Sequence, residues 1–148
     1  YYMANMAKHD AISGNIIFVK KNKIKRLWNY EIKKLNINNS FKIAHTSLVI
    51  KKKFFNLIGN YNTKYSISSD TDFILRMSRK QNIKFKYFDK IFVVMTTGGL
   101  SSNSWNYFNK CKQDLLIYKN HFNESFLFKY IYKMSYKFFK LIVWNVIN

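Results

Sequence analysis

The chain has 148 residues, of which 48% are hydrophobic and 19% aromatic, so it is not intrinsically disordered and is long enough to fold as one domain around a core. Its 26 Lys and Arg residues outnumber 7 Asp and Glu residues, and the formal net charge of +19 favours anionic partners such as nucleotides, nucleic acid or an anionic lipid surface. The single cysteine, Cys111, excludes a disulfide within the chain and indicates a reducing, cytoplasmic compartment.

The first quarter of the chain predicts a strand between two short helical segments. Residues 1–9 are typical of the end of a helix, and the apolar run at 15–19 is typical of a buried strand. The basic stretch 20–25 predicts a hairpin or loop with Asn22 at its tip. Residues 28–35 then predict a short helix.

The middle of the chain predicts a strand followed by two helices. The apolar, β-branched stretch 41–50 predicts the strand. Residues 51–58 predict a short helix, and Gly59 stands just past its end, where glycine is common. The amphipathic pattern at 69–81 predicts the central helix.

The second half predicts two strands, a turn and two long helices. Residues 83–87 alternate between apolar and basic, which indicates a half-buried strand. The continuous apolar run at 91–95 indicates a strand that is covered on both faces. A glycine-containing turn at 96–102 follows, and helices are predicted at 104–122 and 124–147.

The central helix begins with two acidic residues that fall on opposite faces. Ser69 is the predicted N-cap, and Asp72 three residues later completes a pattern like a capping box. At about 100° per residue, Asp72 faces the same way as Arg76 and Arg79, so we expect an ion pair there. Asp70 falls on the apolar face, with no neutralising group nearby in the sequence. That apolar face consists of Phe73, Ile74 and Met77.

Two other interpretations of these acids need weighing. An Asp in the first turn of a helix interacts favourably with the helix dipole and needs no further purpose. A metal site formed by Asp70 and Asp72 is disfavoured, because residues two apart on a helix diverge by about 200°. The histidines also lack the HxxxH or HExxH spacing of a zinc site.

The last predicted helix carries a stripe of four lysines, Lys129, Lys133, Lys137 and Lys140, within about 80° on a helical wheel. The rest of the helix is almost wholly aromatic and aliphatic. Four charges through the middle of a helix are incompatible with a membrane-spanning segment. The stripe therefore predicts either contact with the interface of an anionic membrane, or docking onto a missing part of the protein or a partner subunit.

Five stretches, in the same order, resemble the second half of a family 2 glycosyltransferase of the GT-A fold. Residues 13–17, SGNII, resemble the family's yGd strand, and residues 43–52, IAHTSLVIKK, resemble its hqtlfyrr stretch. Residues 54–61, FFNLIGNY, resemble elfeeiGgfd, and residues 68–77, SSDTDFILRM, resemble aeDydlwlRl. Residues 97–101, TGGLS, resemble the GGvS that follows a strand in the family.

This resemblance implies an α/β fold with a particular division of the chain. Residues 1–122 would form part of a GT-A-like (nucleotide-diphospho-sugar transferase) mixed sheet with flanking helices, and residues 123–148 a basic, aromatic amphipathic helix. Asp70 would be the general base, although Ser69 stands where the family often has Glu. The substrate-binding residues would be His45, Gly98, Gly99 and Ser101.

The family's nucleotide-binding strands and its DxD metal motif precede the yGd strand, and this sequence lacks them; Asp70 and Asp72 are not that motif. The chain starts at Tyr1 with no initiator Met or signal peptide, so we expect the acceptor-side half of a longer protein. The resemblance also implies a divalent metal, Mg or Mn, with ligands mostly in the N-terminal half.

The function implied is inverting transfer of a sugar from a nucleotide-sugar donor to a glycan or lipid-linked acceptor, in bacterial-type cell-surface polysaccharide biosynthesis at the cytoplasmic face of the membrane. In such a site, partial burial is expected to raise the pKa of Asp70 and make it a better base. A nucleic-acid-binding module is a less favoured alternative, because the basic residues are spread along the chain without an RRM, KH or HTH signature. A non-catalytic membrane-surface module is the third possibility.

Overall fold

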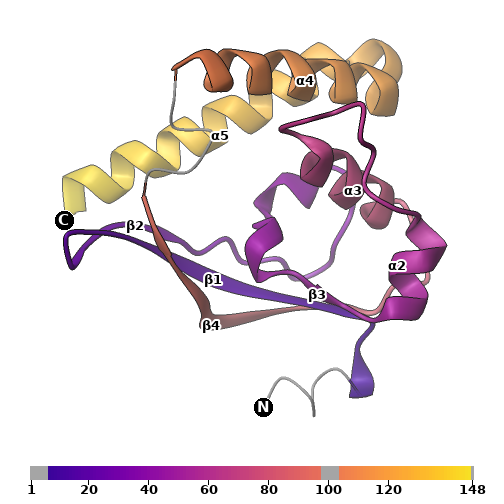
Figure 1. Cartoon of the computed structure of the whole chain (residues 1–148), viewed down its shortest axis with the longest axis horizontal. Helices are drawn as coiled ribbons and strands as arrows, with labels where there is room; N and C mark the ends of the chain where they lie inside the picture. Colours follow the sequence, from indigo (N-terminus) through magenta and orange to yellow (C-terminus); the bar gives the residue numbers. More distant parts are fainter. Residues whose placement is uncertain (1–6, 98–103, 148) are drawn as a thin grey trace.

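The computed structural model describes residues 7–97 and 104–147. Its strands are β1 (Ala11–Lys20), β2 (Lys23–Trp28), β3 (Val49–Ile50) and β4 (Phe85–Thr96), and its helices are α2 (Lys52–Ile58), α3 (Ser69–Ser78), α4 (Ser104–Phe122) and α5 (Phe126–Ile147). Short 3₁₀ turns lie at η1 (Ser40–Lys42), η2 (His45–Ser47) and η4 (Asn123–Ser125). The chain is therefore mixed α/β, as predicted (Figure 1). The expected helix at 1–9 and turn at 96–102 fall largely outside the described residues.

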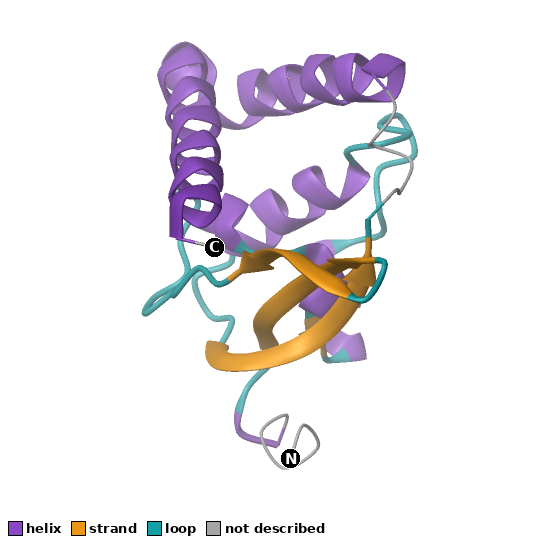
Figure 2. Cartoon of the chain, turned by 90° about the vertical axis from the view of Figure 1, so that its left-hand side faces the viewer, coloured by secondary structure: helices purple, strands orange, loops and turns teal. Residues whose placement is uncertain are grey.

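Strand β1 is the centre of the sheet. It pairs antiparallel with β2 and β3 along one edge, and parallel with β4 along the other. The β1–β2 turn has φ angles of 46° at Lys21 and 58° at Asn22, as the tight hairpin turns that match strand twist require. This confirms the hairpin predicted at 20–25. Helices α3, α4 and α5 all lie on one side of the sheet (Figures 1 and 2).

Strand β4 is one continuous strand, whereas the sequence predicts two, at 83–87 and 91–95. Its pairing with β1 shifts register beside Gly14 and Asn15, because β4 bulges there. A Cβ atom on Gly14 would lie 2.2 Å from the Phe92 ring, so the close approach of the two strands requires glycine. The polar residues between the two apolar runs are thus accommodated in a bulge and do not end the strand.

The outer part of β4 is not covered on both faces, which corrects the expectation for 91–95. Ile91 is 51% exposed and Val94 is 62% exposed. Among the described strands β4 pairs with β1 alone, and the three large helices cover only one side of the sheet. An apolar run is therefore insufficient to identify a strand buried on both faces.

Two segments before α2 differ from the predictions. The expected helix at 28–35 is absent, because β2 continues to Trp28 and an irregular segment follows. Of the strand expected at 41–50, only the two residues of β3 form, and η1 and η2 take the place of the rest. Ser40 and Ser47 each donate a side-chain hydrogen bond to the carbonyl three residues earlier, at 2.9 and 3.0 Å. Such bonds stabilise turns at the expense of a strand.

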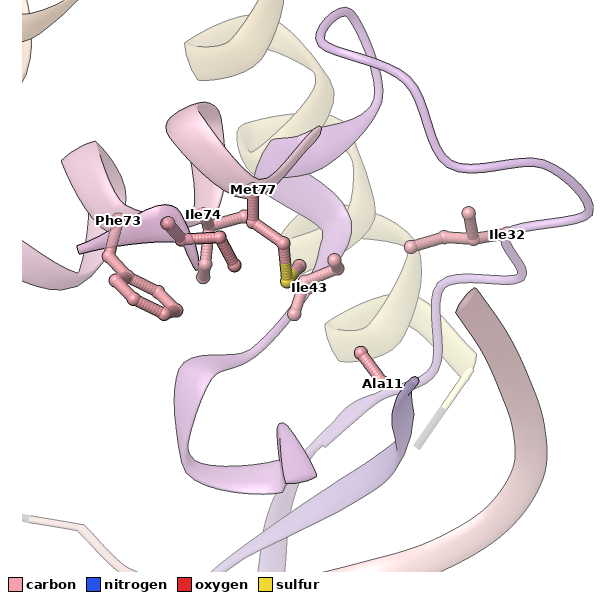
Figure 3. Packing of buried hydrophobic residues seen from close by; sticks show 7 residues of the cluster. Ala11, Ile32, Ile43, Phe73, Ile74 and Met77 are labelled. Atoms are coloured by element: carbon pink, nitrogen blue, oxygen red, sulfur yellow. The ribbon is translucent and has the colours of Figure 1, made fainter. Parts of the chain in front are cut away.

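The main core lies between β1, the irregular segments and α3 (Figure 3). Its buried members are Ala11, Ile32, Ile43, Ile58, Phe73, Ile74 and Met77. The predicted apolar face of α3 supplies the last three. Truncating a large member of such a core costs about 2–5 kcal/mol, so this cluster holds α3 against the sheet.

The start of α3 differs from the predicted capping box. The helix covers Ser69–Ser78 within the predicted 69–81, and Ser68 occupies the N-cap position without a side-chain capping bond. Gln113 of α4 contributes instead: its Oε1 accepts the backbone N–H groups of Ile67 and Ser68 at 3.0 and 3.1 Å. The N-terminus of α3 is thus positioned by a tertiary contact.

The other three helices agree with their predictions. Helix α2 ends at Gly59, whose φ of 88° is readily adopted only by glycine. Helix α4 has the predicted bounds, and α5 begins two residues later than predicted, after η4. Figure 1 shows α4 and α5 side by side above the sheet, and they are in contact.

Candidate functional site

A cleft of about 550 Å³ lies between the sheet and helices α3, α4 and α5. The η2 turn and the first turn of α3 contribute His45 and Asp70 to its lining. Strand β2 contributes Arg26 and Trp28, and the two long helices contribute basic and aromatic side chains. Two of the predicted site residues, distant in sequence, therefore meet in one cleft.

Asp70 and His45 form a direct pair. His45 Nδ1 lies 2.7 Å from Asp70 Oδ2, so this nitrogen carries a hydrogen and donates it to the carboxylate. Asp70 Oδ1 accepts the backbone N–H of Thr71 at 2.8 Å. The Asp70 side chain is 24% exposed and that of His45 is 53% exposed. The carboxylate is thus oriented by the protein while it remains open to the cleft.

The pKa of Asp70 lies below its ordinary value of 3.8. Burial alone would raise this pKa. The hydrogen bond and charge of His45, the charge of Lys110 and the Thr71 N–H lower it, and together they outweigh the effect of burial. The expectation that burial leaves Asp70 with a raised pKa is therefore wrong. The reason is that tertiary structure brings cationic groups to this carboxylate that the local sequence lacks.

Asp72 has entirely different surroundings on the other side of α3. Arg76 Nε donates to Asp72 Oδ2 at 2.8 Å, which agrees with the predicted ion pair, and His121 Nε2 lies 3.1 Å from Oδ1. Arg76 also donates to carbonyls at the end of α2, so it joins α2 to α3. Arg79 does not pair with Asp72; it donates to the carbonyl of His121. Asp72 is thus a structural residue.

A second charged cluster lines the cleft, and sequence reasoning misses it. Asp114 Oδ2 accepts hydrogen bonds from Lys110 Nζ at 2.9 Å and from Lys133 Nζ at 2.7 Å. Burial raises the pKa of Asp114, but the two lysines bring that pKa well below its ordinary value. Lys110 and Asp114 lie four residues apart on a predicted helix, which is a visible signal. No local signal indicates the third member, Lys133.

Three lysines of the α5 stripe, Lys133, Lys137 and Lys140, face the chain itself, which corrects the first interpretation, that the stripe contacts a membrane. Lys133 is 2% exposed. Lys137 Nζ lies 5.1 Å from the centre of the Trp28 ring, and Lys140 Nζ lies 5.5 Å from that of Tyr30. These lysines therefore dock within the chain itself, onto β2, Tyr30 and α4, and not onto a missing part of the protein or a partner subunit as the second interpretation expects.

Helices α4 and α5 expose large apolar side chains, most of them outside the cleft lining. Those that are at least 39% exposed are Trp105, Tyr107, Phe108, Leu116, Leu127, Phe128, Ile131, Tyr132, Phe138, Phe139, Leu141 and Ile142. We refer to this surface as the apolar outer face. Large apolar side chains exposed in this number commonly mark an interaction site.

The remaining predicted site residues cannot be placed in the cleft. Gly98, Gly99 and Ser101 lie outside the described residues. In the described part of the chain, no group of three or more His, Cys, Asp or Glu side chains could hold a metal ion. The two carboxylates of the cleft lining already have side-chain partners, His45 for Asp70 and two lysines for Asp114, so these residues do not fit a metal site.

Comparisons with known proteins add no relative: no protein-family model, curated protein or solved structure matches the chain. Among the described helices, none is long and apolar enough to cross a membrane.

Proposed function

We propose that the chain forms the acceptor side of a nucleotide-sugar-dependent glycosyltransferase with Asp70 as its general base. The observation that carries the proposal is the pairing of Asp70 with His45 in the lining of the cleft. With a pKa below 3.8, Asp70 is ionised at neutral pH, so its oxygens are free to accept a proton, but the lowered pKa makes it a weaker base than the sequence predicts. The five stretches that resemble family 2 glycosyltransferases, with Asp70 at the position of the base, support the same reaction.

In the proposed reaction, a hydroxyl of a glycan or lipid-linked acceptor attacks the anomeric carbon of the donor sugar. Asp70 takes the hydroxyl proton as the new C–O bond forms, and the bond from the sugar to the nucleoside diphosphate breaks. His45 holds the carboxylate in one orientation, which lowers the entropic cost of reaching the reactive geometry. The nucleotide-binding strands and most ligands of any divalent metal that the family implies belong to the N-terminal half expected from the resemblance.

The decisive test is Asp70→Asn in the full-length protein that contains this sequence. Loss of general base catalysis is expected to lower sugar transfer by about 10²–10⁴-fold, with the circular dichroism spectrum unchanged. Glu124→Gln is the matched control, because it neutralises an exposed acid outside the cleft lining and should leave transfer unchanged. Equal transfer by wild-type protein and Asp70→Asn would refute the proposal.

A second substitution separates the roles of the two paired residues. His45→Gln keeps a hydrogen-bond donor beside Asp70, so transfer should fall much less than in Asp70→Asn if Asp70 accepts the proton. Equal losses in both variants would instead make His45 the proton acceptor, with Asp70 orienting it as in a catalytic triad.

The peripheral membrane location is proposed on a different surface from the lysine stripe. The apolar outer face presents aromatic and aliphatic side chains to solvent, and exposed Lys112 and Lys119 flank Leu116 on α4. Apolar side chains bordered by lysines, on a chain of net charge +19, fit the interface of an anionic membrane.

Co-sedimentation with vesicles tests this location. Phe128→Ser combined with Phe139→Ser removes two side chains that are 71% and 65% exposed, so binding to vesicles of anionic lipid should fall strongly while the fold is retained. Exposed Lys64→Gln is a control for general loss of charge. Unchanged vesicle binding by the double variant would refute membrane binding through the apolar outer face. Self-association of the wild-type chain that the double variant abolishes would refute it as well, because the face would then be an interface between copies. Steeply salt-dependent oligonucleotide binding without vesicle binding would favour the nucleic-acid alternative.

A further inference from the structure

The cleft contains more positive than negative side chains, and the proton transfer proposed above does not use this excess. Its lining includes four cationic residues, Arg26, Lys110, Lys133 and Lys137, against two carboxylates, Asp70 and Asp114. The cations come from β2, α4 and α5, so three separate segments converge on the same cavity. Like charges gathered in a partly desolvated space repel each other, and an anionic ligand would relieve that repulsion.

Two of the cations have no acidic partner among the residues that the structure describes. Lys110 and Lys133 share Asp114 Oδ2, and Lys133 is too deeply buried to reach a ligand. Within the described residues, neither Arg26 nor Lys137 forms an ion pair with a carboxylate. Both lie against the Trp28 ring, with Arg26 Cζ 4.9 Å and Lys137 Nζ 5.1 Å from its centre. The ring orients the two cations without neutralising them.

The state of Lys137 follows from this arrangement. Burial lowers its pKa, and the charges of Lys133, Lys110 and Arg26 lower it further. The carboxylate of Asp114 raises the pKa but offsets only part of this, so the pKa is about 7. Lys137 is therefore only partly charged at neutral pH. An anion bound beside it would favour the ammonium form, so binding would be accompanied by proton uptake.

We propose that Arg26, Lys110 and Lys137 bind the diphosphate group of a substrate. A diphosphate has enough charge to match these three cations, and charge-assisted hydrogen bonds to Lys and Arg are strong where water is largely excluded. This inference rests on the proposed function in one respect. The charge of Lys110 lowers the pKa of Asp70, so the two side chains lie near each other, and a diphosphate bound to Lys110 would lie beside the reacting hydroxyl.

The rim of the cleft indicates what the diphosphate is attached to. Tyr107, Phe138 and Leu141 belong to the cleft lining and also to the apolar outer face. A lipid-linked diphosphate could therefore place its head group among the cations and its apolar chain along α4 and α5. A nucleoside diphosphate presents the same anionic chemistry with a base in place of the chain, and the experiment distinguishes the two sources.

The test measures binding of inorganic diphosphate to the chain by isothermal titration calorimetry. Lys137→Met should weaken binding at least about tenfold, the loss of one strong charge-assisted contact. Lys140→Met is the matched control, because Lys140 lies on the same helix over Tyr30 and outside the cleft lining; it should change affinity less than about twofold. Equal losses in the two variants would mean non-specific attraction to a chain of charge +19, and would overturn the proposal, as would no loss in either.

A pH series gives a second readout that general attraction would not produce. As pH rises from about 6 to 9, the diphosphate affinity of the wild type should fall relative to that of Lys137→Arg, because Lys137 loses its proton and arginine stays charged. Titration of the diphosphate itself affects both proteins equally and cancels in this comparison. Parallel pH profiles would exclude a role for Lys137. Lys137→Met and Lys137→Arg are both expected to fold, since neither introduces a new buried unpaired charge.

Two further ligands identify the source of the diphosphate. A short-chain prenyl diphosphate that binds more tightly than inorganic diphosphate indicates a lipid-linked acceptor, and a nucleoside diphosphate that does so indicates the donor. Failure of this site and failure of the proposed function remain distinguishable. If Asp70→Asn binds diphosphate normally but transfers no sugar, both the anion site and the role of Asp70 as general base are supported. If Asp70→Asn still transfers sugar, Asp70 is not the general base, but the anion site is unaffected.

Discussion

The two sides of α3 each carry an aspartate in the first turns of the helix, and the two carboxylates differ in how completely their hydrogen bonds and charge are satisfied. Asp72 is 6% exposed and is bound by both Arg76 and His121. Asp70, two residues earlier, has one side-chain partner, His45, which is 53% exposed, and the pair faces a cleft. A fully satisfied buried carboxylate stabilises a fold, whereas a partly satisfied one beside a cavity retains capacity for a ligand.

This difference separates two explanations for acidic residues in the first turn of a helix. The helix dipole favours both Asp70 and Asp72 equally and so predicts similar behaviour. The tertiary contacts predict opposite behaviour, with Asp72 acting on stability and Asp70 on activity. Two experiments test this contrast, and another tests the joint between α2 and α3 that Arg76 forms beside Asp72; they follow in order of decreasing expected effect.

The largest expected effect is on global stability. Asp72→Ala leaves Arg76 and His121 without their carboxylate and should cost about 2–3 kcal/mol, below the usual value for a broken buried ion pair because Arg76 is partly exposed. Asp70→Ala, the same substitution on the other side, should cost less than about 1 kcal/mol. Urea unfolding of both variants measures the comparison. Similar costs would show that the two sides of the helix do not differ in this way.

The next effect concerns the joint between α2 and α3, where Arg76 bonds backbone carbonyls. Gly59 has φ 88° and ψ 166°, a region populated almost only by glycine, so Gly59→Ala should cost about 1–2 kcal/mol. An added Cβ would meet only ordinary contact, with Arg76 Nη1 at 3.5 Å, so the cost is one of backbone conformation. Asn60→Ala is the control, since Arg76 binds only the backbone carbonyl of that residue. If thermal unfolding shows a lower melting temperature for Asn60→Ala than for Gly59→Ala, the conformational role of Gly59 is contradicted.

The smallest effect is on the acid limb of stability. Because the folded pKa of Asp70 is depressed, its ionised form adds stability above the unfolded value of 3.8, and this share is lost as pH falls through the folded pKa. Asp70→Asn should therefore show a shallower loss of stability below about pH 4 than wild type. Denaturation midpoints measured across this range test the sign; a steeper loss in the variant would mean that the pKa is raised.

The elements that the sequence predicts well are those with local causes. The tight turn at Asn22, the end of α2 at Gly59 and the bounds of α4 follow from backbone preferences and helical periodicity. The segments at 28–35 and 41–50 are predicted wrongly, because packing against α5 and hydrogen bonds of serine side chains decide their conformation. For the site, periodicity places Asp70 on the inner face of α3, but no local pattern pairs it with His45.

The sequence by itself determines that α5 has a lysine side and an aromatic side, since that division depends only on the helical repeat. Only the tertiary structure decides which side is buried. The aromatic rings of Trp28 and Tyr30 and the carboxylate of Asp114 offer the lysines partners that solvent and lipid do not, so the basic side turns inward. A helical wheel assigns residues to faces, whereas contacts between segments distant in the chain assign those faces to the interior or to the surface.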